Sequence, residues 1–236
     1  MRQVCILGRN RPFSDCLPGS AGEMELDGVP VRYGLIETPD PSFDPDDPAN
    51  ADMVLLRVRA FSCNYRDRAL ILRMATTTLD RNYYVIGSDF VAEVVASGRN
   101  VVDLEPGDRV IANNAFPDSG AANVLPGVAS NHSSKEYLVL HRTKLMRIPD
   151  TMHDSVAAGF GIGAQTTYGM VRRIAPQPGE RVLVTAPRSN TSLFALAALR
   201  TRGVQVYGLA RSTASRDRLM AAGMSDVLAL DPVDPD

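Results

Sequence analysis

Apolar residues in the C-terminal third of the chain fall into short runs separated by helical patterns. Val182–Thr185 is a β-branched run without amphipathic alternation, which is typical of a strand buried on both faces of a parallel sheet. The apolar-rich LFALAALRTR follows, and Gly203 stands where a helix would end in a left-handed residue. VQVYGLA, SRDRLMAAG and DVLAL repeat the strand–helix–strand order. The pattern predicts a βαβαβ unit, half of a dinucleotide-binding sheet.

The pattern before this unit is different. From residue 53 onward, strand-like segments follow one another, namely MVLLRVRAFS, FVAEVVASG, RVIANNAF, KEYLVLH and LMRIP. Pro106 and Gly107 can reverse the chain between two of them. The first fifty residues are loop-rich, with a hairpin in residues 22–43 and an acidic turn in residues 44–50. We therefore predict a small, mostly antiparallel barrel or sandwich.

A glycine-interrupted segment joins the two parts. Residues 154–174 have a helical pattern after a capping Asp154, but Gly159, Gly161 and Gly163 interrupt it. We interpret this segment as a hinge and as the wall of a cleft. The predicted domains are residues 1–155 and 156–236.

Composition narrows the class of protein. Of the 236 residues 44% are apolar and 22% charged, and the net charge is −2, so no overall field recruits nucleic acid or an anionic membrane. The three cysteines form no CxxC pair, which fits reduced thiols. No apolar run approaches the length of about 18 residues that a membrane helix needs. We expect a cytoplasmic protein.

Six motifs in fixed order carry a family resemblance: CNYRD, GSDFVAEVVASGRNV, PGDRV, KEYLVL, AQTTYG and PGERVLVTA. Together with the βαβαβ unit they resemble the medium-chain dehydrogenase/reductase superfamily, in its zinc-free quinone oxidoreductase and enoyl reductase branch. The resemblance covers about residues 22–231. It implies an α/β fold with a β-barrel part, in which a GroES-like barrel is followed by a Rossmann domain and the active site lies in the cleft between them.

The chain differs from the family in length. A full dinucleotide fold has about six parallel strands, whereas this sequence stops just after the third. We expect an incomplete Rossmann domain, truncated at its C-terminus, from either a fragment or a shortened natural product with compromised activity.

The resemblance also bears on metal binding. Zinc-dependent relatives place a Cys ligand where Asn64 stands and a His ligand where Ser88 stands. Cys63 is one position away and would point to the opposite face of an extended segment. We predict no metal site, and expect Cys63 to be a buried apolar thiol.

Without a metal, the resemblance implies hydride transfer to an electron-poor alkene or quinone. Asn64 and Tyr65 would line the nicotinamide and substrate side of the cleft, and Thr166 would contact the nicotinamide amide. Tyr84, with Tyr83 beside it, is a candidate proton donor or substrate wall, and core packing stays open for both. Asp67 is expected to hold the local turn together.

The predicted phosphate-binding turn, residues 186–193, contains no glycine. Ser189 and Ser192 stand roughly where the family has glycines, and their small hydroxyl side chains can donate to phosphate oxygens. With Asn190 and Thr191 they are candidate cofactor ligands at a helix N-terminus. The alternative is an ordinary strand–helix connection capped by Asn or Ser.

Residues after the second strand of this unit bear on the choice of cofactor. An acidic residue there would bind the ribose 2′-hydroxyl of NAD, but this chain has Arg211 and Ser212, with Arg216 about one helical turn on. Arginine can grip a 2′-phosphate with two hydrogen bonds, which favours NADPH. The alternative is an arginine cluster that only solvates a helix start.

The sequence therefore predicts an NADPH-dependent, zinc-free oxidoreductase acting on a quinone, an enone or an enoyl thioester, with a homodimer as a further expectation. A degenerate family member that binds a ligand or partner without catalysis is the second hypothesis. A zinc alcohol dehydrogenase is the third.

Overall fold

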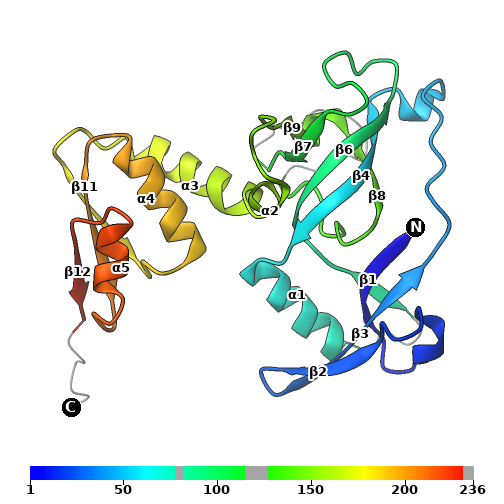
Figure 1. The fold of residues 1–236 in the computed structure, drawn as a ribbon, viewed down its shortest axis with the longest axis horizontal. Coiled ribbons are helices and arrows are strands. Elements are labelled where there is room, and N and C mark those ends of the chain that lie inside the picture. The colour runs from blue at the N-terminus through cyan, green and yellow to red at the C-terminus, as the bar shows by residue number, and fades with distance from the viewer. Residues whose placement is uncertain (78–81, 115–126, 231–236) are drawn as a thin grey trace. The chain divides into compact units, whose positions relative to one another are not determined.

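The computed structural model describes residues 1–77, 82–114 and 127–230 (Figure 1). The chain divides into two compact units, Met1–Ile162 and Gly163–Asp236. The boundary predicted from the sequence, after residue 155, lies on the N-terminal side of this division. Each unit contains its own sheet or sheets and its own apolar core.

The larger sheet of the first unit has five antiparallel strands in the order β8-β4-β6-β7-β9. They are β4 (Met53–Ser62), β6 (Asp89–Ser97), β7 (Arg109–Ala112), β8 (Tyr137–His141) and β9 (Leu145–Arg147). Fully buried Leu56, Phe90 and Val110 belong to the core that this sheet encloses. Gly107 between β6 and β7 has a φ of +95°, as its predicted turn requires. The predicted antiparallel barrel is confirmed.

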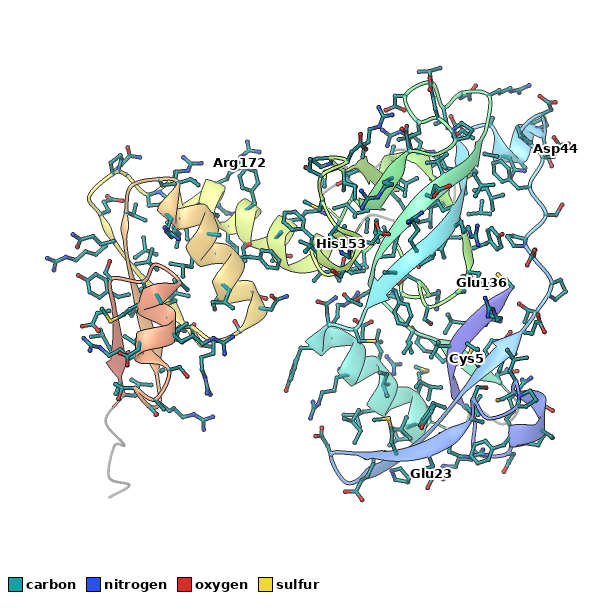
Figure 2. All side chains as sticks on the ribbon, in the orientation of Figure 1. Cys5, Glu23, Asp44, Glu136, His153 and Arg172 are labelled. Carbon is teal, nitrogen blue, oxygen red and sulfur yellow. The ribbon has the colours of Figure 1, made fainter. Side chains whose placement is uncertain are left out.

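A second sheet of four antiparallel strands has the order β2-β3-β1-β5. Its strands are β1 (Arg2–Leu7), β2 (Gly22–Leu26), β3 (Val29–Glu37) and β5 (Tyr83–Val85). The predicted hairpin is confirmed as β2 and β3. The first fifty residues, predicted to be loop-rich, also contain β1, which lies between β3 and β5 and was not predicted. Cys5 on this strand is completely buried (Figure 2).

Helix α1 (Tyr65–Thr76) begins within the CNYRD motif, and Asn64 before it has an extended backbone. The backbone N–H of Asn64, the N-cap residue, donates to Asp67 Oδ2 at 2.7 Å. A carboxylate three residues after the cap is one half of a capping box and stabilises a helix start. The expectation that Asp67 holds the turn is therefore confirmed, whereas helix α1 itself was not predicted from the sequence.

The glycine-interrupted segment forms two helices, α2 (Asp154–Ala157) and α3 (Gly161–Ile174). The cap of α2 is His153, which is labelled in Figure 2 and whose Nδ1 accepts a hydrogen bond from the Ser155 N–H. Asp154 was the predicted cap, but its carboxylate accepts from Arg59 and Arg109 on β4 and β7. These two arginines outcompete the local backbone for the carboxylate.

The second unit is a parallel sheet of three strands in the order β10-β11-β12. Its elements are β10 (Arg181–Thr185), α4 (Asn190–Arg200), β11 (Gln205–Ala210), α5 (Arg216–Ala221) and β12 (Asp226–Ala229). Gly203 and Gly223, which follow the two helices, have φ values of +69° and +112°. The predicted βαβαβ unit and its helix ends are confirmed.

One face of this sheet is covered and the other is not. Val182, Val206 and Val227 pack with Leu199 of α4 and Leu219 of α5. Leu183 and Leu228 point to the opposite face and are 53% and 46% exposed. The prediction that the first strand is buried on both faces is therefore wrong for the described residues.

None of the described helices is long and apolar enough to cross a bilayer.

Shortening a leucine side chain should destabilise the protein more on the covered face of this sheet than on the exposed face. We expect Leu199→Ala to lower the free energy of unfolding by about 2–5 kcal/mol, because Leu199 is only 2% exposed in the helix–sheet core. Leu183→Ala should cost less than about 1 kcal/mol. Denaturant titration of both variants measures this, and equal losses would show that something covers the Leu183 face in solution.

Candidate functional site

A buried polar network in the first unit contains Asn64, Asp67, Ser88 and Asp89. The last three of these side chains are at most 1% exposed. Asn64 Nδ2 donates to Ser88 Oγ at 3.2 Å and to Asp89 Oδ2 at 3.1 Å. Ser88 Oγ donates in turn to Asp67 Oδ2 at 2.5 Å. The network joins the start of α1 to the start of β6 and fixes the orientation of the Asn64 amide.

Asp89 connects this network to the start of α3. Both of its carboxylate oxygens accept from the Ile162 N–H, at 3.0 Å each. A Cβ atom on Gly161 would lie 2.4 Å from Asp89 Oδ1, so only glycine allows this approach. Burial raises the pKa of Asp89, although the hydrogen bonds from Ile162 and Asn64 oppose the rise.

The three tyrosines named from the sequence have different environments. Tyr65 is the first residue of α1 and is 82% exposed. Tyr84 packs edge-on against His132 with ring centroids 5.3 Å apart, and burial raises the pKa of Tyr84, with the Asp67 charge adding to the rise. Tyr83 packs in a different cluster and its hydroxyl accepts from Gln3. Both tyrosines therefore pack against apolar clusters, and Tyr84 is the one whose pKa is influenced by the polar network.

The positions that hold metal ligands in zinc-dependent relatives are brought together, but they carry a neutral amide and a neutral hydroxyl. Asn64 and Ser88 hydrogen-bond to each other. Cys63 is exposed, so its predicted burial is wrong. Within the described ranges, His, Cys, Asp and Glu side chains form no group of three that could hold a metal ion.

In the second unit a cavity of about 640 Å³ opens at the carboxyl ends of β10 and β11. This is the edge at which open parallel sheets bind nucleotides. Its lining comes from the turns that follow the two strands and includes Ser189, Arg211 and Ser212 from the predicted set. Arg188 also lines it and was not among the predicted cofactor ligands, although its place in the glycine-free turn could have indicated it.

The charge of this cavity is positive. Arg188 and Arg211 line it, and no Asp or Glu of the described residues does. Arg216, predicted to join them, is paired with Asp226, at 2.7 Å between Nε and Oδ1, and is not part of the lining. Arg216 is therefore compensated by a carboxylate at the start of β12, and of the two arginines predicted after β11 only Arg211 lines the cavity.

The glycine-free turn is tight and internally hydrogen-bonded. Ala186 has a φ of +47°, a left-handed conformation that glycine adopts more readily. Ser189 caps α4 by accepting from the Ser192 N–H at 3.1 Å. The Ser192 hydroxyl donates to the Thr185 carbonyl, so it is not directed at a ligand. The expectation that Ser192 donates to phosphate does not fit this geometry.

The remaining predicted ligands lie on helices. Asn190 and Thr191 are exposed in the first turn of α4, outside the cavity lining. Thr166 is exposed on α3, whereas its neighbour Thr167 is buried and bonds to the helix backbone. Their roles toward a cofactor stay predictions.

An antiparallel barrel followed by a nucleotide-binding βαβαβ unit defines a class of two-part dehydrogenases. Residues 50–150 match the alcohol dehydrogenase GroES-like domain. The chain is 31% identical over 180 residues to the polyketide synthase GfsB of Streptomyces halstedii, across 76% of this chain and 3% of that protein. The chain belongs to the medium-chain dehydrogenase/reductase superfamily.

Two further proteins are similar. Acryloyl-coenzyme A reductase of Metallosphaera sedula is 26% identical over 193 residues, across 76% of this chain and 55% of that protein. The structure of mycobacterial Rv1454c complexed with NADPH matches with a TM-score of 0.63 and 24% identity, covering 86% of this chain and 56% of that one. The chain thus spans about half the length of these two proteins.

The buried Asp89 predicts a distinct dependence of stability on pH. Because its pKa is raised in the folded state, the folded protein holds this proton over a range in which the unfolded chain has lost it. Its contribution to stability is therefore lost as the pH rises from about 4 toward neutrality. In Asp89→Asn this loss should be absent, so the variant gains stability relative to wild type as the pH rises.

Asp103→Asn is the matched control, because hydrogen bonds from Arg142 lower the pKa of Asp103. The wild-type protein gains stability over an acidic range as the pH rises, because folding lowers the pKa of Asp103. The stability of Asp103→Asn relative to wild type should therefore fall over that range. Denaturant titrations at several pH values measure both differences, and parallel curves for the two variants would refute the assignment of a raised pKa to Asp89.

Proposed function

We propose that this chain forms part of an NADPH-dependent, zinc-free oxidoreductase that reduces a conjugated carbonyl compound. The observation that carries the proposal is the positively charged cavity at the carboxyl edge of the parallel sheet, lined by Arg188, Arg211 and Ser212. The substrate class proposed is an enone, a quinone or an enoyl thioester.

The chemistry of the cavity supports the cofactor. A nicotinamide nucleotide, when bound, supplies a hydride for an electron-poor carbon. Arg211 can donate two hydrogen bonds to a 2′-phosphate, and Ser212 can add a third. An acidic side chain that would bind a free 2′-hydroxyl does not line the cavity within the described residues. The structure of a protein with the same fold, mycobacterial Rv1454c, contains bound NADPH.

The polar network of the first unit is proposed as the substrate side. Both Asn64 amide hydrogens are used by Ser88 and Asp89, which fixes the orientation of this amide at the start of α1. The Tyr84 hydroxyl is protonated at neutral pH, as any tyrosine with a pKa of about 10 is, and burial raises this pKa further. It can therefore donate a hydrogen bond to the substrate oxygen on which negative charge develops when hydride reaches the β-carbon.

The second candidate is a ligand-binding protein without catalysis. The glycine-free turn favours it, because Ala186 is strained and the Ser192 hydroxyl is satisfied within the protein. This candidate keeps a nucleotide or partner site but forms no product.

The cellular setting proposed from the sequence is a reducing cytoplasm. Cys5, Cys16 and Cys63 are all free thiols, and burial raises the pKa of Cys5 to about 12, which keeps it protonated. The homodimer expected from the sequence stays a prediction.

An activity assay separates the two candidates. Purified protein is mixed with NADPH and, in turn, an enone, a quinone and an enoyl thioester, and the loss of nicotinamide absorbance is followed. We expect oxidation with at least one acceptor, and faster oxidation of NADPH than of NADH. Nucleotide binding by calorimetry without turnover of any acceptor would instead favour the non-catalytic candidate.

Removing Arg211 should change the cofactor preference. We expect Arg211→Ala to weaken NADPH binding about tenfold or more, since a charge-assisted hydrogen bond contributes roughly 1.5–3 kcal/mol. NADH lacks the 2′-phosphate, so its affinity should stay nearly unchanged. Calorimetric titration of both nucleotides is the measurement.

Arg202→Ala is the control for net charge, because Arg202 is an exposed arginine of the same unit outside the cavity lining. It should leave both affinities unchanged. If Arg211→Ala weakened NADH and NADPH equally, Arg211 would support the fold and would not recognise the phosphate.

A further inference from the structure

A second positively charged pocket lies entirely within the first unit. It has a volume of about 550 Å³ and is bounded by the start of α1, the segment of residues 128–132 and strand β8. Four basic side chains line it, namely Arg66, His132, Lys135 and Lys144. No Asp or Glu of the described residues is among its lining.

The pocket contains both lysines of this chain. Lys135 and Lys144 are the only lysines of the sequence, and both line this one pocket. Burial lowers the pKa of both side chains. A cation partly removed from water is costly unless an anion compensates it.

The arginines elsewhere on this unit mostly have such a compensating carboxylate. Arg2, Arg59, Arg68, Arg109, Arg142 and Arg147 each form an ion pair with an Asp or Glu. In the pocket, Arg66 instead donates to the neutral amide oxygen of Asn131 at 2.9 Å. Lys135 has no ion-pair partner among the described residues. Arg66 and Lys135 therefore bring positive charge to the pocket without an ion-pair partner among the described residues.

The pocket adjoins the proposed substrate side. His132 Nδ1 lies 3.0 Å from the Val85 carbonyl, which can only accept, so this nitrogen carries a proton. The same ring packs against Tyr84. Arg66 follows the cap of α1, two residues from Asn64. A ligand held here by its anionic end would extend along residues that we assign to substrate binding.

We propose that this pocket binds a phosphate ester, and specifically the phosphate at the end of a thioester carrier arm. Lys135 and Arg66 would donate charge-assisted hydrogen bonds to its oxygens. Binding of the phosphoryl anion is independent of the proposed reduction, whereas the assignment to a thioester carrier rests on it.

Lysine acylation tests the pocket directly, because the chain has only two lysines. Wild-type protein is treated with an amine-acylating reagent, and modification of Lys135 is followed by mass spectrometry. The added ligands are 4′-phosphopantetheine, pantetheine and inorganic phosphate, and the α-amine of Met1 is the internal reference. At about ten times its dissociation constant, phosphopantetheine should slow acylation of Lys135 about tenfold, and pantetheine should not.

Arg66→Gln removes one cation and keeps the reporter lysine. It should raise the phosphopantetheine concentration needed for protection about tenfold. Arg99→Gln is the control, because Arg99 is exposed on the same unit outside the pocket, and it should have no effect.

Three results would contradict the proposal. Absence of protection by phosphopantetheine and by inorganic phosphate would overturn the anion pocket, as would equal protection by pantetheine. Inorganic phosphate as effective as phosphopantetheine would overturn the carrier assignment. None of these readouts requires turnover, so failure of the proposed reductase activity would be seen separately.

Discussion

The carboxylate of Asp89 is the constraint on which the first unit and its polar site depend. An acidic side chain that is 1% exposed must have hydrogen-bond donors, because an uncompensated buried charge costs several kcal/mol. The donors are the Asn64 amide and the Ile162 N–H, from the cap of α1 and the first turn of α3. One carboxylate thereby fixes two helix starts relative to β6. Gly161 is required there because a side chain would collide with Asp89.

The same constraint organises the chemistry proposed for this unit. Because Ser88 and Asp89 occupy both hydrogens of the Asn64 amide, the orientation of this amide is fixed. Asp67 in turn contributes to the raised pKa of Tyr84. In the second unit the organising feature is the edge at which parallel strands end, where short turns bring Arg188 and Arg211 to one cavity. Charge and its compensation therefore define both groups of candidate residues.

Local patterns were enough to predict most strands and turns. The run beginning at Met53 is β4, and the positive φ of Gly107 and Gly203 follows from the turn and helix end that each forms. Helix α1 was missed, although Asn64 followed three residues later by Asp67 is a helix-start signal. Burial of Cys63 was also predicted wrongly, since this thiol is exposed at the residue before the cap of α1.

Contacts between side chains of different helices and strands could not be predicted from local sequence patterns. Arg216 stands where a phosphate ligand was expected, but it begins helix α5 and pairs with Asp226 at the start of β12. The pocket of basic residues combines positions 66, 132, 135 and 144, which only the fold brings together. The uncovered face of the parallel sheet likewise depends on both helices packing against one side, which a single strand cannot indicate.

The proposed hydride transfer is tested most directly by isotope labelling. The protein is supplied with NADPH deuterated at C4 of the nicotinamide, on one face and then on the other, together with an enoyl thioester. Hydride transfer predicts one deuterium at the β-carbon of the product, from one of the two labelled faces only. A reduced product without deuterium from either cofactor, or no reduced product while NADPH binds, would contradict it.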